Sequence, residues 1–535
     1  FATRAMIQTP FLSSPPTPPV ASWRSLTYGI VALAPSLFIS RLGWVGMKVT
    51  DTALLGHVGT HALAASSLSD LWTMASGVFI QGRVLGIFVG NAVGAAKAGT
   101  APWSVAGEWF QVSVAVLGVI ALAVMGLWAI TEPVLRLFGY SSRLLSDASF
   151  FSLVLMACIP ARVLFSQLSQ YLAAQGIVKP SMQVALIGLA TNLALGLVLV
   201  VGVPFEQFSA NASSAGGEVH RASAVGGYGF PACPIVTSVV EWMQLAALVG
   251  IYCLCLGYHR QGWPTNTGCW GFSLAVVTRA RVAAYLRLYV PAALSIASDF
   301  WRMSAVGAFA ARLSTLDLAV FTASYRIMWI SLVLSHSLTG GVSIVVGQAL
   351  GGNRPRDARR SIAIGFVLAL LANAIIGVVV LLLPRQLGSI FSSDHLVLEQ
   401  FGLVRLELML AVVAMNLAVV LEGLLMSTGR TKAVLVVGVI GSWCGQVPMV
   451  ALLVTFWEPS LRAVFLGVSG GYVLLCAGLG AALVRLDWSV LAQEAEARAS
   501  IGPAAPTVAS QDEEGARRGG GQPADDADVP PAQDC

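Results

Sequence analysis

The stretch "VGQALGGNRPRDARRS", Val346 to Ser361, differs from the oily chain around it and decides how that chain is divided. Its first half is small and apolar, and its second half gathers four arginines around Asp357. A weaker copy of the first half, "VGNAVGAAKAG", begins at Val89, at an offset of 257 residues. Two such copies predict an internal repeat, which we trace below through the rest of the chain.

Composition places the chain in a membrane. Of its 535 residues, 56% are hydrophobic and only 11% are charged, whereas soluble domains carry about 25% charged residues. A soluble fold this apolar would expose large sticky patches. The net charge of +5 lacks the interleaved basic and aromatic runs of nucleic-acid binders, so we expect no nucleic-acid partner. None of the eight cysteines forms a CxxC pair, so nothing points to a metal site.

Apolar windows long enough to span a bilayer occur about twelve times, since one crossing needs roughly 20 residues. All should be helices, because lipid offers the backbone no hydrogen-bond partners. The fold class we expect is therefore an all-α polytopic membrane protein with about twelve transmembrane helices. The windows are 28–55, 63–95, 106–130, 146–173, 178–203, 229–257, 285–312, 317–350, 359–384, 398–427, 431–456 and 461–486.

The expected domains follow from these windows. Residues 28–258 should form an N-terminal six-helix bundle and 285–486 a C-terminal one, joined by a cytoplasmic linker at 259–284. Residues 1–27 lack acids and are rich in Ser, Thr and Pro, which is typical of a disordered or targeting segment. Residues 487–535 are acidic and rich in Gly, Pro and Ala, so we expect a disordered cytoplasmic tail.

Lys and Arg in the connections set the orientation. Basic residues concentrate in the loops on the side of both termini, which places both termini in the cytoplasm. The arginines of the opening stretch then anchor a cytoplasmic loop, and binding of anionic lipid headgroups is compatible with that role. On this topology the loop near 205–228 is external, and Asn211 in it begins an N-glycosylation pattern.

Three pairs of segments carry the repeat. Leu63 pairs with Leu318, Val89 with Val346 and Lys179 with Lys432, at offsets of 255, 257 and 253 residues. Each unit spans about six crossings, so both copies enter the membrane in the same orientation and are related by an axis along the membrane normal. Two facing bundles with a central cleft are the architecture of secondary transporters. Without a Walker A motif, we expect an ion gradient, and no cofactor, to supply the energy.

Three motifs carry a family resemblance. "VTDTALLGHVGTHALAA" resembles the first-helix signature of the multidrug and toxic compound extrusion (MATE) family, especially its DinF-like branch. "VGQALGGNRPRDARR" and "GLLMSTGRTKAVL" resemble that family's eighth-helix end and its tenth-to-eleventh-helix turn. The resemblance implies a monomeric antiporter that exchanges protons or sodium for small organic compounds. The expected location is the plasma membrane or an organelle membrane such as that of a plastid or vacuole.

Asp51 is the first candidate for ion coupling, since an ionisable group inside a crossing is expensive and is usually functional. A carboxylate in an apolar cleft could exchange protons near neutral pH, and oxygens of Thr52 and Asn192 could help it to hold sodium. The alternative is a structural ion pair with Lys48 or Arg41 on the same helix. The DinF-like branch carries an acid four residues after the asparagine, where this chain has Gly196.

Asp299 and Glu422 are candidates for the substrate cleft, together with Trp301, whose ring could hold a cation. The alternative for Asp299 is a salt bridge to Arg302, three residues on. Other charged or titratable residues within crossings are weaker candidates, and the arginines among them could pair with the acids or favour an anionic substrate. These residues are Glu241, Glu407, Arg83, Arg162, Arg326 and His336.

Several functions compete at this point. The main expectation is a MATE-type antiporter that exports organic, mostly cationic, compounds. One alternative is a lipid-linked oligosaccharide flippase of related architecture, which would usually have about fourteen crossings. A transporter of organic anions is another. A membrane acyltransferase would need a histidine with an acid partner, and no such pair stands out. The missing acid at Gly196 also keeps a non-transporting relative open.

Overall fold

The computed structural model describes residues 21–137, 141–202, 227–263, 272–391 and 394–501, and all regular structure within these ranges is helical. The all-α fold class is therefore confirmed. Most of the predicted disordered or targeting segment, with the Asn211 pattern and most of the expected tail, lies outside the described residues; at residues 23–27 that expectation is wrong, because the chain there is helical.

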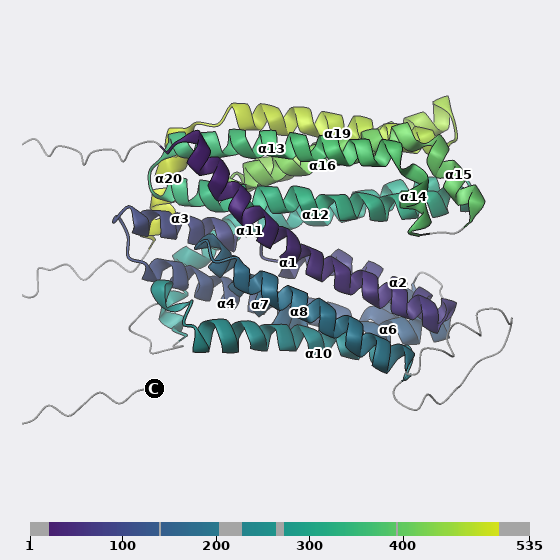
Figure 1. The fold of residues 1–535 in the computed structure, drawn as a ribbon, viewed down its shortest axis with the longest axis horizontal. Coiled ribbons are helices and arrows are strands. Elements are labelled where there is room, and N and C mark those ends of the chain that lie inside the picture. The colour runs from purple at the N-terminus through teal and green to yellow at the C-terminus, as the bar shows by residue number, and fades with distance from the viewer. Residues whose placement is uncertain (1–20, 138–140, 203–226, 264–271, 392–393, 502–535) are drawn as a thin grey trace, which may run out of the picture. The chain divides into compact units, whose positions relative to one another are not determined.

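Helices from the first half of the chain gather into one lobe (Figure 1). Apart from α1 and α3, they contact mainly one another, with α8 against α10 and α2 against α6. Two helices, α6 and α7, meet at a bend of 47°. The helices of this N-lobe are α1 (Trp23–Val58), α2 (Thr60–Gly77), η1 (Val78–Ile80), α3 (Leu85–Lys97), α4 (Ser104–Ala129), α5 (Thr131–Arg136), α6 (Ser142–Met156), α7 (Ile159–Ala174), α8 (Lys179–Gly196) and α10 (Ala232–Ala247).

Helices from the second half form the C-lobe, in which α16 packs against α12, α13 and α19 (Figure 1). Its apolar core runs through these helices, with Leu408, Phe401 and Phe465 fully buried. The helices of the C-lobe are α11 (Arg279–Ala310), α12 (Thr315–Gly351), α13 (Pro355–Leu382), α14 (Pro384–Ser389), α15 (His395–Leu403), α16 (Arg405–Ser427), α17 (Thr431–Val439), η7 (Ile440–Gln446), α18 (Val447–Leu452) and α19 (Leu461–Val484).

Each of the twelve apolar windows coincides with one helix or with several consecutive helical segments. Among the described residues, ten helical segments are long and apolar enough to cross a membrane, and the bent pair α6 and α7 makes an eleventh. The remaining window belongs to α11, whose 32 residues exceed the roughly 20 that a crossing needs. That helix carries Asp299 and four arginines, which sets it apart from the others.

The two segments that first indicated the repeat, beginning at Val89 and Val346, lie directly against each other. Helices α3 and α12 cross where the Cα atoms of Gly90 and Gly347 face one another. A Cβ placed on Gly94 would lie 2.1 Å from the carbonyl oxygen of Gln348, and one on Gly351 would lie 2.0 Å from that of Asn91. Only glycine permits backbones to approach this closely. The contact is reciprocal, as expected where a pseudo-two-fold axis relates the lobes.

Helices α1 and α11 connect the lobes. The first half of α1 packs on α12 and α13 of the C-lobe, and its second half packs on α8 and α10 of the N-lobe. In the same way, the first half of α11 reaches the N-lobe, where Tyr285 contacts the Ser113 hydroxyl at 3.2 Å, and its second half packs on α17 and α19. Movement of one lobe against the other must therefore bend or tilt these two helices.

The expectation of a disordered tail from residue 487 is wrong for residues 488–500, which form helix α20 (Trp488–Ser500). Its Leu491 and Ala495 are fully buried, and the helix contacts α3 of the N-lobe together with α12 and α13 of the C-lobe. Asp487 caps its start, and hydrogen bonds from the Ser489 hydroxyl and from the backbone of Val490 and Ser489 hold the pKa of the Asp487 carboxyl below its usual value. The acidic composition that suggested disorder belongs mainly to residues further on.

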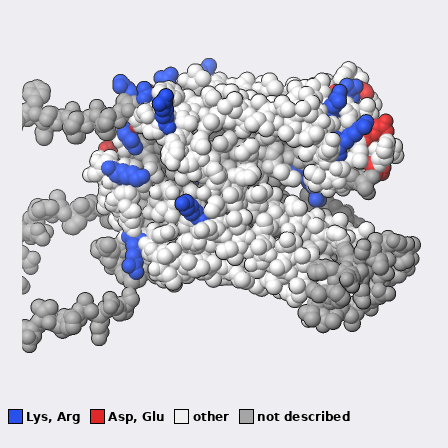
Figure 2. Space-filling model, in the orientation of Figure 1, with Lys and Arg blue, Asp and Glu red and all other residues white. Residues whose placement is uncertain are grey.

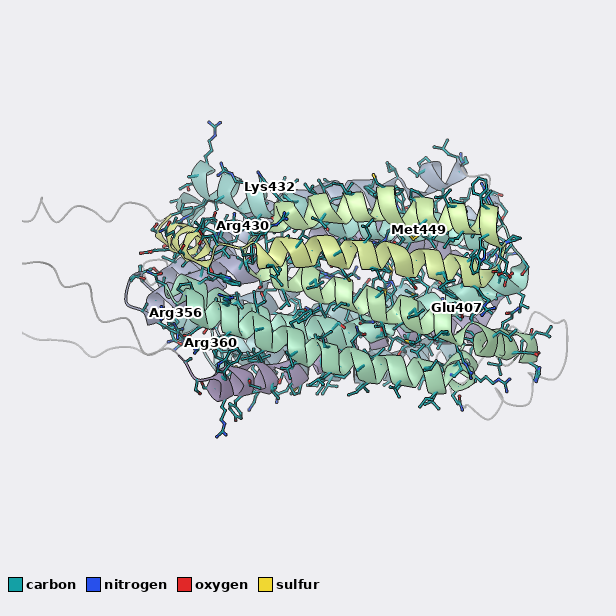
Figure 3. All side chains as sticks on the ribbon, turned by 90° about the horizontal axis from the view of Figure 1, so that it is seen from above. Arg356, Arg360, Glu407, Arg430, Lys432 and Met449 are labelled. Atoms are coloured by element: carbon teal, nitrogen blue, oxygen red, sulfur yellow. The ribbon has the colours of Figure 1, made fainter. Side chains whose placement is uncertain are left out.

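Lys, Arg, Asp and Glu side chains gather mainly toward the two ends of the helices, and few lie on the visible face between them (Figure 2). Arg356, Arg360, Arg430 and Lys432 lie at the end where α20 lies, and Glu407 lies at the opposite end (Figure 3). Residues that the loop analysis assigned to one side of the membrane thus share one end of the structure. We call this the α20 end; the prediction is that it faces the cytoplasm.

Candidate functional site

The Asp51 carboxylate lies inside the N-lobe, 6% exposed, on the second half of α1. Two neighbouring helices supply one hydrogen-bond donor each. The Asn192 amide of α8 donates to Oδ1 at 3.3 Å, and the Thr237 hydroxyl of α10 donates to Oδ2 at 2.8 Å. Of the predicted partners, Asn192 is therefore in place. We refer to Asp51, Asn192 and Thr237 as the Asp51 site.

Lys48 does not form the expected alternative ion pair with Asp51. Its ammonium lies 3.1 Å from Oδ1 of Asp70, on α2. Within the described residues, no Lys or Arg nitrogen makes an ion pair with the Asp51 carboxylate. Thr52 also turns away, because its hydroxyl donates to the carbonyl of Lys48 on its own helix at 2.9 Å. Asp51 is thus a buried carboxylate held by neutral donors.

A second buried ion pair lies one helical turn further along α10. Glu241 accepts hydrogen bonds from Arg162 of α7, with the shortest at 2.6 Å from Nη2 to Oε1. Two of the charged residues that the sequence left without partners therefore pair with each other. Glu407 similarly pairs with Arg462, 2.8 Å from its Nε, at the end opposite α20. Both acids are satisfied by local cations and neither reaches the Asp51 carboxylate.

Gly196 stands where the DinF-like branch, which the first-helix motif resembles, carries a second acid. A Cβ on this residue would lie 2.4 Å from Cδ1 of Leu54, on α1. The space that an acidic side chain would need is therefore filled by an apolar one, one turn beyond Asp51. The Asp51 site accordingly contains a single carboxylate.

The C-lobe also holds an ion pair on its first helix, α11, which is the counterpart of α1 in the repeat. Asp299 Oδ1 lies 3.2 Å from Nη2 of Arg302, which is the bridge that the sequence offered as the alternative to a cleft role. Arg302 also donates to Ser442 of η7 at 2.8 Å and to Tyr472 of α19 at 3.0 Å, and its guanidinium lies 4.8 Å from the centre of the Tyr472 ring. Trp301 is 48% exposed and lies outside these contacts.

Glu422 lies between the lobes, on α16. Its Oε1 accepts a hydrogen bond from Ser295 of α11 at 3.3 Å. It also interacts electrostatically with Arg83, which follows η1 of the N-lobe, and with Asp299. Arg83 is exposed to solvent although it lies among these groups. The charges that face each other across the lobes are therefore mixed in sign.

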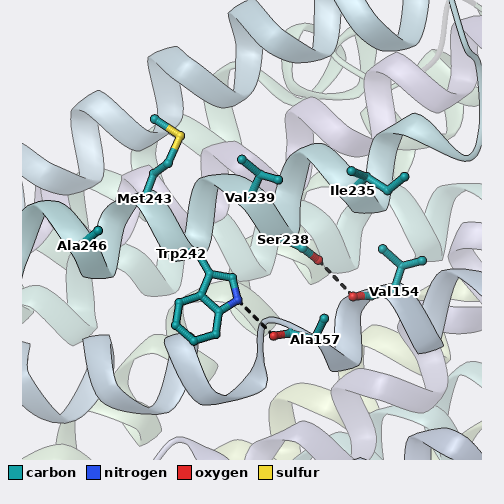
Figure 4. Close-up of a pocket in the computed structure, with 8 residues that line it drawn as sticks. All are labelled: Val154, Ala157, Ile235, Ser238, Val239, Trp242, Met243 and Ala246. Carbon is teal, nitrogen blue, oxygen red and sulfur yellow. Dashed lines mark hydrogen bonds between the residues drawn. The ribbon is translucent and has the colours of Figure 1, made fainter.

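A surface groove of about 700 Å³ beside the bend of α6 and α7 is apolar and separate from these charges (Figure 4). Helix α10 donates hydrogen bonds to two backbone carbonyls at this bend, of which that of Val154 also accepts the Ala157 N–H at 3.2 Å. Ser238 donates to the carbonyl of Val154, and Trp242 donates to that of Ala157, both at 3.1 Å. Such repair of a broken helix is needed where lipid cannot donate hydrogen bonds. Helix α10 thus turns Thr237 and Glu241 to the interior and Ser238 and Trp242 to the groove.

The sequence analysis missed Thr237 and Asp70. Thr237 and Glu241 stand four residues apart inside an apolar crossing, a spacing that predicts one polar face. Asp70 lies in a window that was treated as one straight crossing. Among the described residues, no group of three or more His, Cys, Asp and Glu side chains is arranged to hold a metal ion.

Comparison with known families fits this geometry. The MatE family model matches residues 36–198 and 291–452, one match in each lobe, and together they cover more than half of the chain. The chain belongs to the MatE family. It is therefore a multi-pass integral membrane transporter and not an enzyme. The two matched segments also coincide with the two copies of the repeat.

Relatives of this MatE protein include plant, bacterial, fungal and rabbit proteins. Protein DETOXIFICATION 29 of Arabidopsis thaliana is 22% identical over 505 residues, covering 91% of this chain and 93% of the relative. Multidrug resistance protein PmpM of Pseudomonas aeruginosa is 22% identical, covering 88% and 96%. The crystal structure of the eukaryotic MATE transporter AtDTX14 superposes with a TM-score of 0.76 at 18% identity, covering 89% of this chain and 99% of that one. This likeness establishes the two-lobed fold.

Proposed function

We propose that this MatE protein is a secondary antiporter that moves organic compounds across the membrane in exchange for ions, with Asp51 as the ion-coupling group. One observation carries the proposal: Asp51 is buried, accepts hydrogen bonds from two neutral side chains and makes no ion pair among the described residues. A buried charge normally has an ionic partner. A carboxylate without one can gain and lose a cation at a lower cost than a paired carboxylate can.

Alternating access would follow from the contacts between the lobes. At the α20 end the lobes are joined by the glycine crossing of α3 with α12 and by α20 itself. Lys97 adds a hydrogen bond to Gln348 at 2.8 Å, and Gln348 donates to the carbonyl of Ala174 at 2.7 Å. Opening toward this end requires all of these contacts to separate. When these contacts form again, the lobes would have to separate at the opposite end.

The charges between the lobes bear on the substrate. Glu422 and Asp299 would attract an organic cation, which is the substrate class that the family resemblance favours. Arg41 and Arg83 act on one another and on His336 in the same region, and both arginines are exposed. They would bind a carboxylate, so an organic anion or a compound with charges of both signs is the second candidate. A lipid-linked oligosaccharide flippase is less favoured, because the helices account for about twelve crossings rather than fourteen.

The test is uptake by proteoliposomes under imposed gradients. Purified protein would be reconstituted, a pH or sodium gradient imposed in separate vesicles, and the uptake of a fluorescent organic cation and of a radiolabelled carboxylate followed. The proposal predicts uptake that responds to one of the gradients and collapses when an ionophore dissipates it. Uptake that is indifferent to both gradients for every substrate would refute antiport.

A further inference from the structure

Lys48 stands one helical turn before Asp51, yet its ammonium is held by Asp70 of the neighbouring helix, 3.1 Å away. The lysine therefore lies beside the Asp51 site without neutralising it. Both members of the Lys48–Asp70 pair are mostly buried, with 17% and 26% of their side chains exposed. Burying an ion pair costs desolvation free energy. The proposed antiport cycle assigns no role to this pair.

Charged side chains near the Asp51 site come from its own helix and from three neighbouring helices. Lys48 of α1 and Asp70 of α2 act on Asp51 directly, Arg162 of α7 acts on Lys48, and Glu241 of α10 pairs with Arg162; within the described residues α8 presents the neutral Asn192. The cysteine nearest to the site, Cys233 of α10, is buried. Among these charged groups, Lys48 acts on Asp51 more strongly than Asp70 does, so the net field of the pair at Asp51 is positive.

The ligands around Asp51 are poorly arranged for sodium. Both carboxylate oxygens already accept hydrogens, one from the Asn192 amide and one from the Thr237 hydroxyl. The Thr52 hydroxyl is engaged with its own backbone. The buried Oδ1 of Asn192 has no hydrogen-bond partner in the part of the chain that the structure describes, which leaves one oxygen of this set available. A hard cation prefers a shell of several oxygens, whereas a proton needs only one carboxylate oxygen.

We propose that Lys48 makes the Asp51 site selective for protons over sodium ions. The proposal rests on Asp51 being the ion-coupling group. A proton neutralises the carboxylate where it stands and leaves the Lys48–Asp70 pair untouched. A sodium ion would have to settle between Asp51 and the Lys48 ammonium, where the two positive charges repel, and would find few oxygens in compensation. Lys48 thus acts through its charge on the site and is a specificity-determining residue.

The deciding experiment measures equilibrium binding of radioactive ²²Na⁺ to purified protein. Four proteins would be compared: wild type, Asp70→Asn, Lys48→Met with Asp70→Asn, and that double variant with Asp51→Asn. The double substitution removes both members of the ion pair, so no buried charge is left without its partner. Asp70→Asn alone keeps the ammonium and is the matched control.

The expected result is saturable sodium binding by the double variant, at least about tenfold tighter than by wild type or Asp70→Asn, and lost again with Asp51→Asn. Sodium binding by wild type that depends on Asp51 would overturn the proposal. So would a double variant that remains monodisperse on size exclusion but binds no more sodium than wild type. If it is not monodisperse, Lys48→Gln with Asp70→Asn takes its place in the same comparison.

Binding of sodium is measured without transport, so this result is separate from the fate of the antiport proposal. Wild-type vesicles that ignore every gradient would refute antiport, while the sodium titration would still decide what Lys48 does. Conversely, uptake driven by sodium in wild-type vesicles would overturn the role of Lys48 and leave antiport standing.

Discussion

The two lobes hold opposite charges on their first helices, at positions that differ by about one helical turn within the repeat. In the N-lobe, Asp51 of the first crossing lies between the fifth and sixth crossings and accepts hydrogen bonds from Asn192 and Thr237. In the C-lobe, Arg302 of the seventh crossing lies between the eleventh and twelfth and donates to Ser442 and Tyr472. The difference is in the counter-ion. Arg302 pairs with Asp299, one turn away on its own helix. Lys48 lies one turn from Asp51 but pairs with Asp70 of another helix.

This contrast separates a group that can change charge from one that holds a helix in place. Arg302 is always protonated, and its hydrogen bonds to Ser442 and Tyr472 hold α11 against η7 and α19. Asp51 can be charged or neutral while its two neutral donors stay where they are. Two lobes built from one repeat can therefore divide the work, with ion coupling in the N-lobe and a rigid anchor in the C-lobe.

The largest effect should come from Asp51→Asn. The amide keeps the size of the carboxylate but cannot carry the charge, so ion-driven uptake should fall by about a hundredfold, near the top of the usual range of coupling strengths. Uptake by proteoliposomes under the productive gradient is the measurement. Met substitution of Arg302 should reduce uptake far less per folded molecule. Equal losses at the two positions would end the proposed division of work.

The next largest effect should be a loss of stability when alanine replaces a glycine at the α3–α12 crossing. The loss should be similar in the two lobes. Gly94→Ala places a Cβ against the carbonyl of Gln348, and Gly351→Ala places one against that of Asn91. Since backbone must shift in both cases, each should lower stability by about 2–3 kcal/mol, in the upper range for overpacking. Thermal unfolding in detergent checks this. Gly86→Ala, on α3 with open space around its Cβ, is the control and should change little.

Arg302→Met should have a somewhat smaller effect on stability. It leaves Asp299 without its cation, and losing one partner of a fully buried pair costs about 3–5 kcal/mol. Because 35% of the Asp299 side chain is exposed, we expect about 2 kcal/mol. Adding Asp299→Leu should recover part of the loss, since no unpaired charge then remains. A double variant less stable than the single one would show that the pair does more than anchor α11.

The smallest effect should come from an exposed ion pair of the same lobe. Arg430 lies 3.1 Å from Glu494 of α20, and both side chains are more than a third exposed. Exposed pairs contribute at most about 1 kcal/mol, so Arg430→Gln should change stability by about 0.5 kcal/mol or less. A loss as large as that of Arg302→Met would mean that α20 is held by this contact rather than by its buried Leu491 and Ala495.

Much of the fold followed from the sequence, because lipid imposes simple rules. Twelve apolar windows matched helices, and the repeat, first seen as "VGQALGG" echoing "VGNAVGA", correctly indicated two related lobes. Direct contact between these two segments could not be predicted, because spacing along the chain does not say which faces meet. Helix α20 was missed because its composition is polar and its stability comes from packing against both lobes.

The candidate site was predictable in part. Asp51 and Asn192 stood out as polar residues inside crossings, and the structure brings them together. The alternative to a coupling role, an ion pair of Asp51 with Lys48, rested on helical spacing alone, and Lys48 pairs with Asp70 of another helix instead. Thr52 and Trp301 were candidates partly because they lie next to Asp51 and close to Asp299 in the chain. Successive residues of a helix, however, point in different directions. Contacts between helices are what the sequence leaves open.

The central claim is that Asp51 couples substrate movement to an ion, and substrate-driven proton movement tests it most directly. Vesicles containing a pH-sensitive dye would receive substrate on the outside with no imposed gradient, and the internal pH would be followed. We predict that wild-type protein lets substrate in and protons out, so that the interior becomes alkaline. Asp51→Asn should still exchange labelled for unlabelled substrate but move no protons. Undiminished alkalinisation in Asp51→Asn would contradict the claim.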